Sequence, residues 1–465
     1  MENFDYDILV IGTGPAGQKA ALAAAKAGQH VAIIERRPVV GGVCINTGTI
    51  PSKTMREAVL YLSGWREHAV YGASYAVKQH IEISDLLMRC EYVMRHEIDV
   101  IRHQMSRNDI EVINACASFI DPHTLQLDVE GNRSQRTVRA DWIVIATGTD
   151  AARGGDVALD GKDVFTSDDI LQLDRIPHTL AVIGAGVIGC EYASIFAALG
   201  VRVTLVDARP NLLSFVDEEI VGMLCYHLRD NRATLRLGET VVRVDRLPDN
   251  RVRTTLQSGK QLVTDMALHS VGREGATGEL NLPAAGVVAD SRGRIPVDEN
   301  YQTNIEHVYA VGDVIGFPSL ASTSMEQGRI AVCHALQIPV RSEPSLFPYG
   351  IYTVPEISMV GKTEQELTEE GIPYEVGKAQ YREIARGQII GDMHGVLKVI
   401  FHAETRHLLG VHIIGEGASE LIHIGQAVLA FEGKVDYFID TVFNYPTLAE
   451  CYKVAAFDGI NRLAE

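Results

Sequence analysis

The chain has 465 residues, 46% of them hydrophobic and 22% charged, a composition that is typical of globular proteins and excludes a disordered or fibrous chain. Asp and Glu number 60 against 42 Lys and Arg, for a formal net charge of -18. We therefore expect no binding to nucleic acid or to an anionic membrane. At about 100 to 200 residues per domain, the length predicts about three domains.

The seven cysteines are scattered and contain no Cys-x-x-Cys pair, which excludes a zinc ribbon and a secreted disulfide framework. The first residues, MENFDYD, are acidic where a signal peptide would be basic, and no apolar run approaches the roughly 18 residues of a membrane-spanning helix. These features predict a cytoplasmic protein without a membrane segment or a bound metal.

The first motif is DILVIGTGPAG, residues 7–17, an apolar run that passes through Gly12, Gly14 and Gly17 into an Ala-rich stretch. This order predicts a strand, a tight turn and a helix. Gly12 permits the turn, Gly14 lets a pyrophosphate approach the backbone, and Gly17 lets the helix pack closely on the strand. A second strand ends in Glu35, where a carboxylate can accept hydrogen bonds from a ribose. The segment predicts a dinucleotide site.

The pattern recurs with Gly184, Gly186, Gly189 and Asp207. In both copies the acid follows the first glycine by 23 residues. Two matched units indicate two dinucleotide sites in doubly wound α/β domains.

Three further strands end at polar or glycine residues. ADWIVIATG, which ends at Gly148, and MALHSVGRE, which contains Gly272, are each predicted to mark a crossover between domains. HVYAVGD reaches Gly312 and Asp313, where a carboxylate just past a strand end can hold a sugar or polyol hydroxyl.

Together with GGVCINTGTIPSK at 41–53 and NYPTLAE at 444–450, these motifs resemble the flavoprotein disulfide-reductase superfamily along essentially the whole chain. The resemblance implies two Rossmann-like domains and a C-terminal α+β interface domain that forms a homodimer or a larger homo-oligomer. The implied division is an FAD domain at 1–148, an inserted NAD(P) domain at 149–272, the second part of the FAD domain at 273–345 and the interface domain at 346–465.

The same resemblance implies which residues bind the cofactors. Those expected at FAD are Gly12, Gly14, Gly17, Glu35, Arg36, Gly42, Cys44, Lys53, Ala117, Gly148, Gly312, Asp313, Leu320 and Ala321. Those expected at NAD(P) are Gly184, Gly186, Gly189, Asp207, Arg209 and Gly272. By analogy, Asp313 takes the ribitol, the Leu320–Ala321 helix start faces the flavin N1 edge, and Lys53 lies near flavin N5, paired with Glu191.

Two positions depart from the disulfide reductases. Members of that superfamily carry a Cys-x-x-x-x-Cys redox pair, but here Cys44 is followed by Thr49, and a hydroxyl cannot form a disulfide. Their catalytic His before the C-terminal proline is Tyr445, and a phenol, with a usual pKa of about 10, is a poor base at pH 7. We therefore predict that the protein has no disulfide chemistry.

This combination is similar to the soluble pyridine nucleotide transhydrogenases of bacteria, which implies hydride transfer between NADPH and NAD through FAD, with NAD and NADP as substrates. Lys53, Glu191, Thr49 and Tyr445 are the residues expected at the reaction centre. An NAD(P)H-dependent flavin reductase or diaphorase is the alternative enzyme, and a redox-silent nucleotide sensor is the alternative from another class.

Several roles stay open at this point. Cys44 is either a remnant of the redox pair or a flavin contact, Thr49 either bonds the flavin or fills volume, and Tyr445 either lines the flavin or packs. Asp207 favours NAD through its ribose, whereas Arg209 can pair with the 2′-phosphate of NADP. His423, in LIHIGQAV, is expected on a buried helix face.

Overall fold

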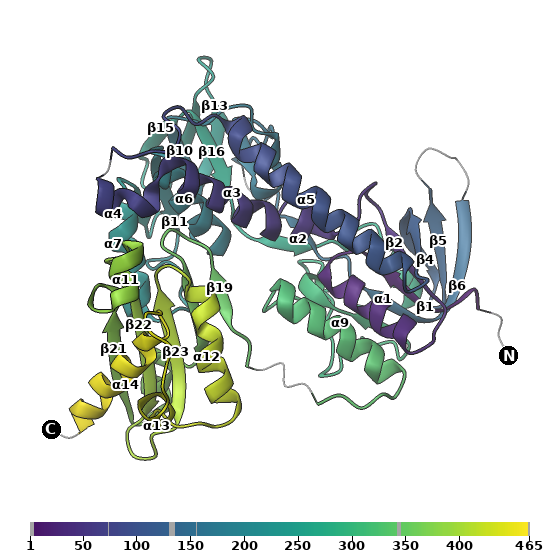
Figure 1. Cartoon of the computed structure of the whole chain (residues 1–465). Coiled ribbons are helices and arrows are strands. Elements are labelled where there is room, and N and C mark those ends of the chain that lie inside the picture. The colour runs from purple at the N-terminus through teal and green to yellow at the C-terminus, as the bar shows by residue number, and fades with distance from the viewer. Residues whose placement is uncertain (1–3, 73, 130–134, 155, 342–345, 464–465) are drawn as a thin grey trace. The chain divides into compact units, whose positions relative to one another are not determined.

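The computed structural model describes residues 4–72, 74–129, 135–154, 156–341 and 346–463. The chain forms two compact units (Figure 1). The first unit comprises Met1–Thr54, Leu87–Ala152 and Gly272–Pro344. The second unit comprises Met55–Leu86, Arg153–Val271 and Ser345–Glu465. Two helices, α3 (Thr49–Ser63) and α5 (Ile83–Ser106), contain boundaries between the units.

The first unit is built on a seven-stranded sheet with the order β3-β2-β1-β6-β5-β4, to which β18 adds beside β6. Strands β3, β2, β1, β6 and β18 are parallel, and β4 and β5 form an antiparallel extension. The strands are β1 (Tyr6–Ile11), β2 (Val31–Glu35), β3 (Glu111–Asn114), β4 (Cys116–Asp121), β5 (Thr124–Asp128), β6 (Gln135–Ile145) and β18 (Val308–Ala310), with a small separate ladder of β7 (Thr149–Ala151) and β17 (Arg273–Gly275).

Helices of the first unit pack on this sheet (Figure 1). They are α1 (Pro15–Lys26), α2 (Gly42–Asn46), most of α5, α8 (Leu282–Ala285), the 3-10 turn η3 (Gly312–Ile315) and α9 (Ala321–Ala335). α1 and α9 lie against each other, and a Cβ on Gly328 would come within 2.1 Å of the Ala16 carbonyl oxygen. Small residues therefore bring the two helices into backbone contact.

The second unit contains another parallel sheet, with the order β12-β11-β10-β16-β9. An apolar cluster lies between it and a second sheet, β15-β14-β13-β8. The elements are β8 (Asp156–Val157), β9 (Val164–Thr166), η2 (Ser167–Gln172), β10 (Thr179–Ile183), α6 (Val187–Ala198), β11 (Arg202–Asp207), α7 (Glu218–Asp230), β12 (Thr234–Leu237), β13 (Val241–Arg246), β14 (Val252–Leu256), β15 (Gln261–Thr264) and β16 (Met266–His269).

The C-terminal part of the second unit is an antiparallel sheet, β19-β20-β23-β22-β21, with helices packed on it (Figure 1). Its elements are β19 (Tyr349–Ile351), β20 (Ile357–Gly361), α10 (Glu364–Glu370), β21 (Tyr374–Gln380), η4 (Tyr381–Glu383), α11 (Ala385–Ile390), β22 (Val396–His402), β23 (Leu408–Ile414), α12 (Ala418–Ala430), α13 (Asp436–Asp440) and α14 (Glu450–Leu463). The same unit also includes η1 (Trp65–Glu67) and α4 (His68–Tyr71).

A buried ion pair joins the parallel and antiparallel parts of the second unit. The ammonium of Lys398 in β22 donates to both carboxylate oxygens of Asp217, at 2.8 and 2.9 Å, and both side chains are 1% exposed. Asp217 also caps the start of α7. Glu219 and Glu364 contact the same ammonium, whose single positive charge offsets part of the negative charge of the three carboxylates.

One expectation about the C-terminal part is wrong. His423 of α12 is exposed, and its Nδ1 lies 2.9 Å from Oε1 of Gln426. Its apolar neighbours in the sequence, Ile422 and Gly425, are buried in the described chain, so His423 lies on the opposite side of the helix.

Candidate functional site

In the first glycine turn, between β1 and α1, main-chain contacts leave no room for a side chain at two of the three glycines. Gly12 has φ of +108°, and a Cβ there would lie 2.4 Å from the carbonyl oxygen of Ala146 in the neighbouring strand segment. A Cβ on Gly17 would lie 1.9 Å from the Gly12 carbonyl oxygen, whereas one on Gly14 would meet nothing within 4 Å. Gly14 therefore faces open space at the helix N-terminus, where an anion is stabilised by free N–H groups and the helix dipole.

Glu35, at the end of β2, is tied to this turn. Its carboxylate accepts a hydrogen bond from the Thr13 N–H at 3.2 Å and another from the Thr13 hydroxyl, and it accepts from the Arg37 N–H at 2.9 Å. Gly42, with φ of +59°, lies beside the turn, because its Cβ would come within 2.8 Å of the Gly14 Cα. The acid is thus held in one orientation beside the glycines.

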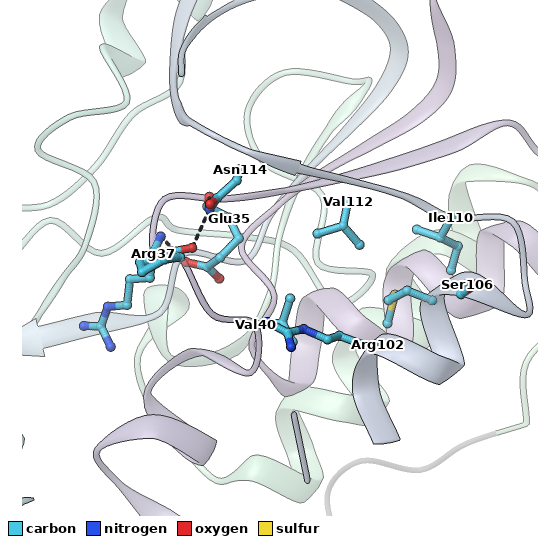
Figure 2. Close-up of a pocket in the computed structure, with 10 residues that line it drawn as sticks. Glu35, Arg37, Val40, Arg102, Ser106, Ile110, Val112 and Asn114 are labelled. Atoms are coloured by element: carbon cyan, nitrogen blue, oxygen red, sulfur yellow. Dashed lines mark hydrogen bonds between the residues drawn. The ribbon is translucent and has the colours of Figure 1, made fainter. Parts of the chain in front are cut away.

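A pocket of about 350 Å³ opens next to Glu35 in the first unit. Figure 2 shows Glu35, Arg37 and Asn114 at one end and Ser106 and Ile110 at the other. Asn114 donates from Nδ2 to the Glu35 carbonyl oxygen at 2.8 Å. The remaining lining residues are Pro38, Val40, Arg102, Met105 and Val112. The pocket combines an apolar wall with a carboxylate, as a nucleoside site requires.

The strand end at β6 has an unsatisfied polar atom. The hydroxyl oxygen of Thr147 is buried and has no hydrogen-bond partner among the residues that the structure describes. Thr147 lies next to the Gly12 turn, since a Cβ on Gly12 would be 3.3 Å from its Cα. Gly148 follows with φ of +68°. A buried hydroxyl without a partner indicates a place where a ligand supplies the missing hydrogen bond.

Asp313 lies in η3, directly after β18. Burial raises the pKa of its carboxyl, while the Arg273 guanidinium and a hydrogen bond with Ser324 lower it. The Gly312 N–H donates to Oε1 of Gln327 in α9 at 2.8 Å. α9 begins at Ala321 with Leu320 as its N-cap, which is where the sequence predicts a helix N-terminus.

Two residues of the predicted FAD set have other surroundings. Ala117 of β4 is 7% exposed and belongs to the apolar core of the first unit. Arg36 forms ion pairs with Asp150 at 2.9 Å and Glu279 at 3.3 Å, and its side chain is 38% exposed.

Cys44 and Thr49 lie in consecutive helices, Cys44 in the middle of α2 and Thr49 at the start of α3. Burial raises the pKa of the Cys44 thiol, and a hydrogen bond with the Thr49 side chain lowers it. The net shift is upward, so the thiol is protonated near pH 7 and is a weak nucleophile. Lys53 follows one turn after Thr49 in α3 and is half-buried.

The second glycine turn, between β10 and α6, repeats the first. Gly184 has φ of +100° with its Cβ direction blocked by Ser270, a Cβ on Gly189 would lie 1.8 Å from the Gly184 carbonyl oxygen, and one on Gly186 would meet nothing within 4 Å. Gly272, with φ of +92°, follows β16 and likewise has open space where a Cβ would be.

Asp207 accepts the same two main-chain hydrogen bonds as Glu35, without the hydroxyl bond of Thr13 and with an added arginine contact. It accepts from the Ala185 N–H at 2.6 Å and the Arg209 N–H at 2.8 Å. The Arg209 guanidinium also donates to both carboxylate oxygens, at 3.0 and 2.8 Å. Burial raises the pKa of Asp207, but these hydrogen bonds outweigh it and the pKa is lowered. The acid is therefore ionised and partly neutralised by a neighbouring arginine.

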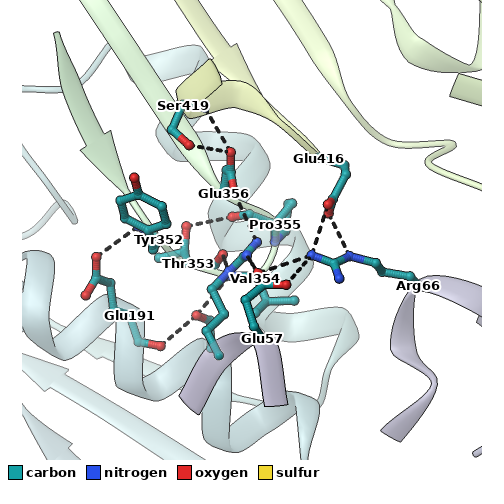
Figure 3. Close-up of polar contacts among 12 residues, drawn as sticks. Glu57, Arg66, Glu191, Tyr352, Thr353, Val354, Pro355, Glu356, Glu416 and Ser419 are labelled. Atoms are coloured by element: carbon teal, nitrogen blue, oxygen red, sulfur yellow. Dashed lines mark hydrogen bonds and ion pairs between the residues drawn. The ribbon is translucent and has the colours of Figure 1, made fainter. Parts of the chain in front are cut away.

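Glu191, in α6, is 3% exposed. Its Oε1 accepts a hydrogen bond from the Tyr352 N–H at 2.9 Å (Figure 3). The Ser194 hydroxyl, one turn further along α6, accepts from the Val354 N–H at 3.0 Å. No sequence pattern predicts these contacts, because they join residues about 160 positions apart.

Tyr445 is 67% exposed in the second unit. Glu450, which starts α14, has a buried Oε2 that finds no hydrogen-bond partner within the described part of the chain.

The family described as pyridine nucleotide-disulphide oxidoreductase matches residues 6–328, and the dimerisation domain of the same family matches residues 347–456. The chain belongs to the pyridine nucleotide-disulphide oxidoreductase family. It is therefore an oxidoreductase, with the α/β dinucleotide-binding domains and C-terminal dimerisation domain of that family, and the predicted fold class is confirmed.

Relatives within this family include a soluble pyridine nucleotide transhydrogenase of Mycobacterium tuberculosis, which is 54% identical over 459 residues and covers 99% of this chain and 98% of the relative. One of Azotobacter vinelandii is 46% identical over 466 residues and covers 100% of both chains. The resemblance to the soluble transhydrogenases is confirmed.

Solved structures of the oxidoreductase family have the same fold. The flavoprotein disulfide reductase RclA of Escherichia coli matches with a TM-score of 0.87 at 29% identity, covering 97% of this chain and 99% of that one. LpdA of Mycobacterium tuberculosis matches with a TM-score of 0.89 at 26% identity and the same coverage.

Among the residues that the structure describes, none of the helices combines the length and apolar character that a bilayer crossing requires.

Proposed function

We propose that this oxidoreductase is an FAD-dependent transhydrogenase that moves a hydride between NADPH and NAD and has no redox dithiol. The observation that carries the proposal is the pair of matched glycine turns, each tied to its own acid, combined with Thr49 at the position where a dithiol needs a second cysteine. Two nucleotide sites without a thiol acceptor leave a second nucleotide as the simplest electron acceptor.

The first unit has features that fit FAD. The open face at Gly14 suits a pyrophosphate, the pocket beside Glu35 suits the adenosine, and the unpartnered Thr147 hydroxyl and half-buried Asp313 are polar groups available to the rest of the cofactor. The exposed Arg36 and the N-terminus of α9 at Leu320–Ala321 belong to the proposed binding set, together with Gly12, Gly17, Gly42, Cys44, Lys53, Ala117, Gly148 and Gly312.

When bound, the flavin accepts a hydride from one nicotinamide and gives it to another. The overall exchange, NADPH and NAD+ to NADP+ and NADH, releases and takes up no net proton. It therefore needs no general base, which agrees with Tyr445 standing where a disulfide reductase has its histidine.

The residues around the reaction centre have positioning and electrostatic roles in this proposal. By analogy with the family, Lys53 would bring a positive charge to the bound flavin and Glu191 would be its partner, which would stabilise negative charge that develops during hydride transfer. Thr49 holds the Cys44 thiol by their hydrogen bond, and Tyr445 would line the far face of the flavin across the dimer.

The second glycine turn, Gly184, Gly186 and Gly189 with Gly272, is proposed to bind both nicotinamide substrates in turn. Asp207 accepts from the adenosine ribose of NAD, and Arg209 turns to the 2′-phosphate of NADP. Their mutual ion pair, with Nη2 and Oδ2 at 2.8 Å, supports this proposal because each residue masks the charge of the other when the wrong nucleotide is present.

The proposed domain boundaries are 1–148, 149–272, 273–345 and 346–465. The dimerisation-domain match over 347–456 supports a homodimer. All seven cysteines are free thiols in the described chain, and this supports a reducing cytoplasmic location.

Half-reactions test the proposal. Purified protein is mixed anaerobically with NADPH in a stopped-flow instrument, then with NAD. We expect the flavin absorbance band at about 450 nm to disappear with NADPH and to return when NAD is added. A flavin that bleaches with NADPH but recovers only with oxygen or a quinone would instead indicate a flavin reductase or diaphorase. A flavin that never bleaches would indicate a nucleotide sensor.

A further inference from the structure

Residues 352–354 of the second unit, which follow β19, are bound to α6 by two main-chain N–H groups. The Tyr352 N–H donates to the Glu191 carboxylate at 2.9 Å (Figure 3). The Val354 N–H donates to the Ser194 hydroxyl at 3.0 Å. Glu191 and Ser194 are one helical turn apart, so the two bonds fix the segment along the helix.

Ser194 also bonds to Glu191 directly. Its hydroxyl donates to the Glu191 carbonyl oxygen at 2.8 Å while it accepts from Val354. The Ser194 side chain is 1% exposed, so water has no access to replace it. The Ser194 hydroxyl is therefore linked to Glu191 in two ways. It bonds the Glu191 carbonyl oxygen directly, and it is connected to the Glu191 carboxylate through the segment from Val354 to Tyr352.

The opposite side of the segment is fixed by a buried charge. Arg56 of α3 donates from Nε to the Thr353 carbonyl oxygen at 2.9 Å, and its side chain is 3% exposed. The same guanidinium pairs with Glu57 at 2.7 Å and Glu356 at 3.5 Å. Thr353 itself is fully buried. The segment is thus held between α6 and α3, with the side chains of Glu191 and Ser194 as its hydrogen-bond partners on α6.

Glu356 extends this anchoring into the antiparallel sheet. Its Oε1 accepts from the N–H and the hydroxyl of Ser419, at 2.9 and 3.0 Å (Figure 3). Burial raises the pKa of Glu356, and Arg56 lowers it. The pairing with Arg56 offsets part of the cost of burying the Glu356 carboxylate.

We infer that Ser194 is a positioning residue for the proposed reaction: by fixing segment 352–354 against α6, its hydroxyl sets the orientation of the Glu191 carboxylate. The inference rests on the proposed function, because the pairing of Glu191 with Lys53 belongs to that proposal. A buried carboxylate that turns away from its partners changes the charge near the flavin, and this alters hydride transfer without a contact between Ser194 and any substrate.

Hydrogen exchange of the purified full-length protein tests the structural part of the inference without reference to activity. Ser194→Ala removes the acceptor of the Val354 N–H. We expect faster exchange at Val354 and also at Tyr352, whose acceptor is Glu191, measured amide by amide with mass spectrometry. Faster exchange at Val354 alone would show that Ser194 acts only locally and would overturn the inference.

Ser63→Ala is the matched control. The Ser63 hydroxyl donates to the Val59 carbonyl oxygen of its own helix at 2.7 Å and accepts from the Trp65 N–H at 3.3 Å, so it makes the same two kinds of bond elsewhere in the second unit. We expect no change in exchange at Tyr352 in this variant. If Ser194→Ala does not fold, Ser194→Cys, with a weakly bonding sulfur, is measured in the same way.

A double-mutant cycle tests the functional part. We expect Ser194→Ala to slow flavin bleaching by NADPH about tenfold, with little change in the NADPH dissociation constant. Glu191→Gln is uncharged and of the same shape, so adding Ser194→Ala to it should slow bleaching no further. If adding Ser194→Ala to Glu191→Gln slows bleaching by the same factor as Ser194→Ala does alone, the inference is overturned.

Failure of the inference and failure of the proposed function give different results. If NADPH does not bleach the flavin of the unmodified protein, the proposed function is wrong. If bleaching is normal but Ser194→Ala and Ser63→Ala have equal rates, only the positioning role of Ser194 is wrong.

Discussion

The two glycine turns of this protein share a backbone and differ in the side chains around it. In each, the third glycine packs on the carbonyl of the first, with a Cβ contact of 1.9 Å at Gly17 and 1.8 Å at Gly189. In each, the acid accepts from the N–H that follows the first glycine, at 3.2 Å for Glu35 and 2.6 Å for Asp207. The frame is therefore repeated in detail.

The turns differ in side chains, since the Thr13 hydroxyl donates to Glu35 and Ala185, at the equivalent position, has no hydroxyl. Two further differences lie at equivalent positions. Arg37 bonds Glu35 through its main-chain N–H, whereas Arg209 adds a bidentate guanidinium contact to Asp207. The strand beside the turn has Ile145 opposite Ile11 in the first unit and His269 opposite Ile183 in the second. Glycines and main-chain groups thus build a general nucleotide frame, and a few side chains determine which nucleotide it takes.

The largest effects are expected where the frame itself is broken. Gly17→Ala places a Cβ against the Gly12 carbonyl oxygen and should yield protein without FAD, whereas Gly189→Ala should retain FAD but lose bleaching by NADPH. Absorbance spectra and stopped-flow traces measure both. Gly222→Ala in α7, where a Cβ meets nothing within 4 Å, is the control and should be fully active. Loss of FAD in Gly189→Ala would contradict separate roles for the two turns.

A smaller effect is expected from the arginine that distinguishes the turns. Arg209→Ala should raise the KM for NADPH about tenfold and leave that for NADH within about twofold, because only NADPH carries the 2′-phosphate. Steady-state kinetics with each nucleotide measure this. Arg251→Ala, which removes a surface arginine paired with Asp249 at 2.7 Å, is the control. Equal changes for NADPH and NADH in Arg209→Ala would refute a role in reading the phosphate.

The smallest effect concerns His269. Burial lowers its pKa, and its Nδ1 is buried without a partner in the described chain. In the unfolded chain, His269 titrates near pH 6.5, so below about that pH the unfolded state binds more protons at this residue than the folded state does. His269 therefore lowers the stability of the wild type as the pH drops below about 6.5.

His269→Ile, which copies the first unit, should raise stability by roughly 1 kcal/mol at pH 7.5 by removing the unpartnered nitrogen. Between pH 7.5 and 5.5, the melting temperature of the His269→Ile variant should fall by less than that of the wild type. His227, whose pKa burial lowers to about 4, is present in both proteins and forms a common background. If the melting temperatures of the two proteins fall equally across this pH range, His269 does not titrate as expected.

Patterns within short segments could be predicted from the sequence, and contacts between distant segments could not. The glycines need conformations and close contacts that other residues cannot adopt, so their spacing alone predicted both turns. The bidentate bond from Arg209 to Asp207 depends on a side-chain rotamer, which the two-residue spacing does not determine. The link from Ser194 to Val354 joins segments 160 residues apart, and His423 was assigned to the wrong helix face because its neighbours are apolar.

An anaerobic assay of NADPH with an NAD analogue of distinct absorbance, compared with a disulfide substrate under the same conditions, tests the central claim most directly. We expect steady reduction of the analogue at the expense of NADPH and no turnover of the disulfide, because Thr49 stands where the second cysteine of a redox pair would be. Turnover of the disulfide, or bleaching of the flavin without transfer to the analogue, would contradict the account.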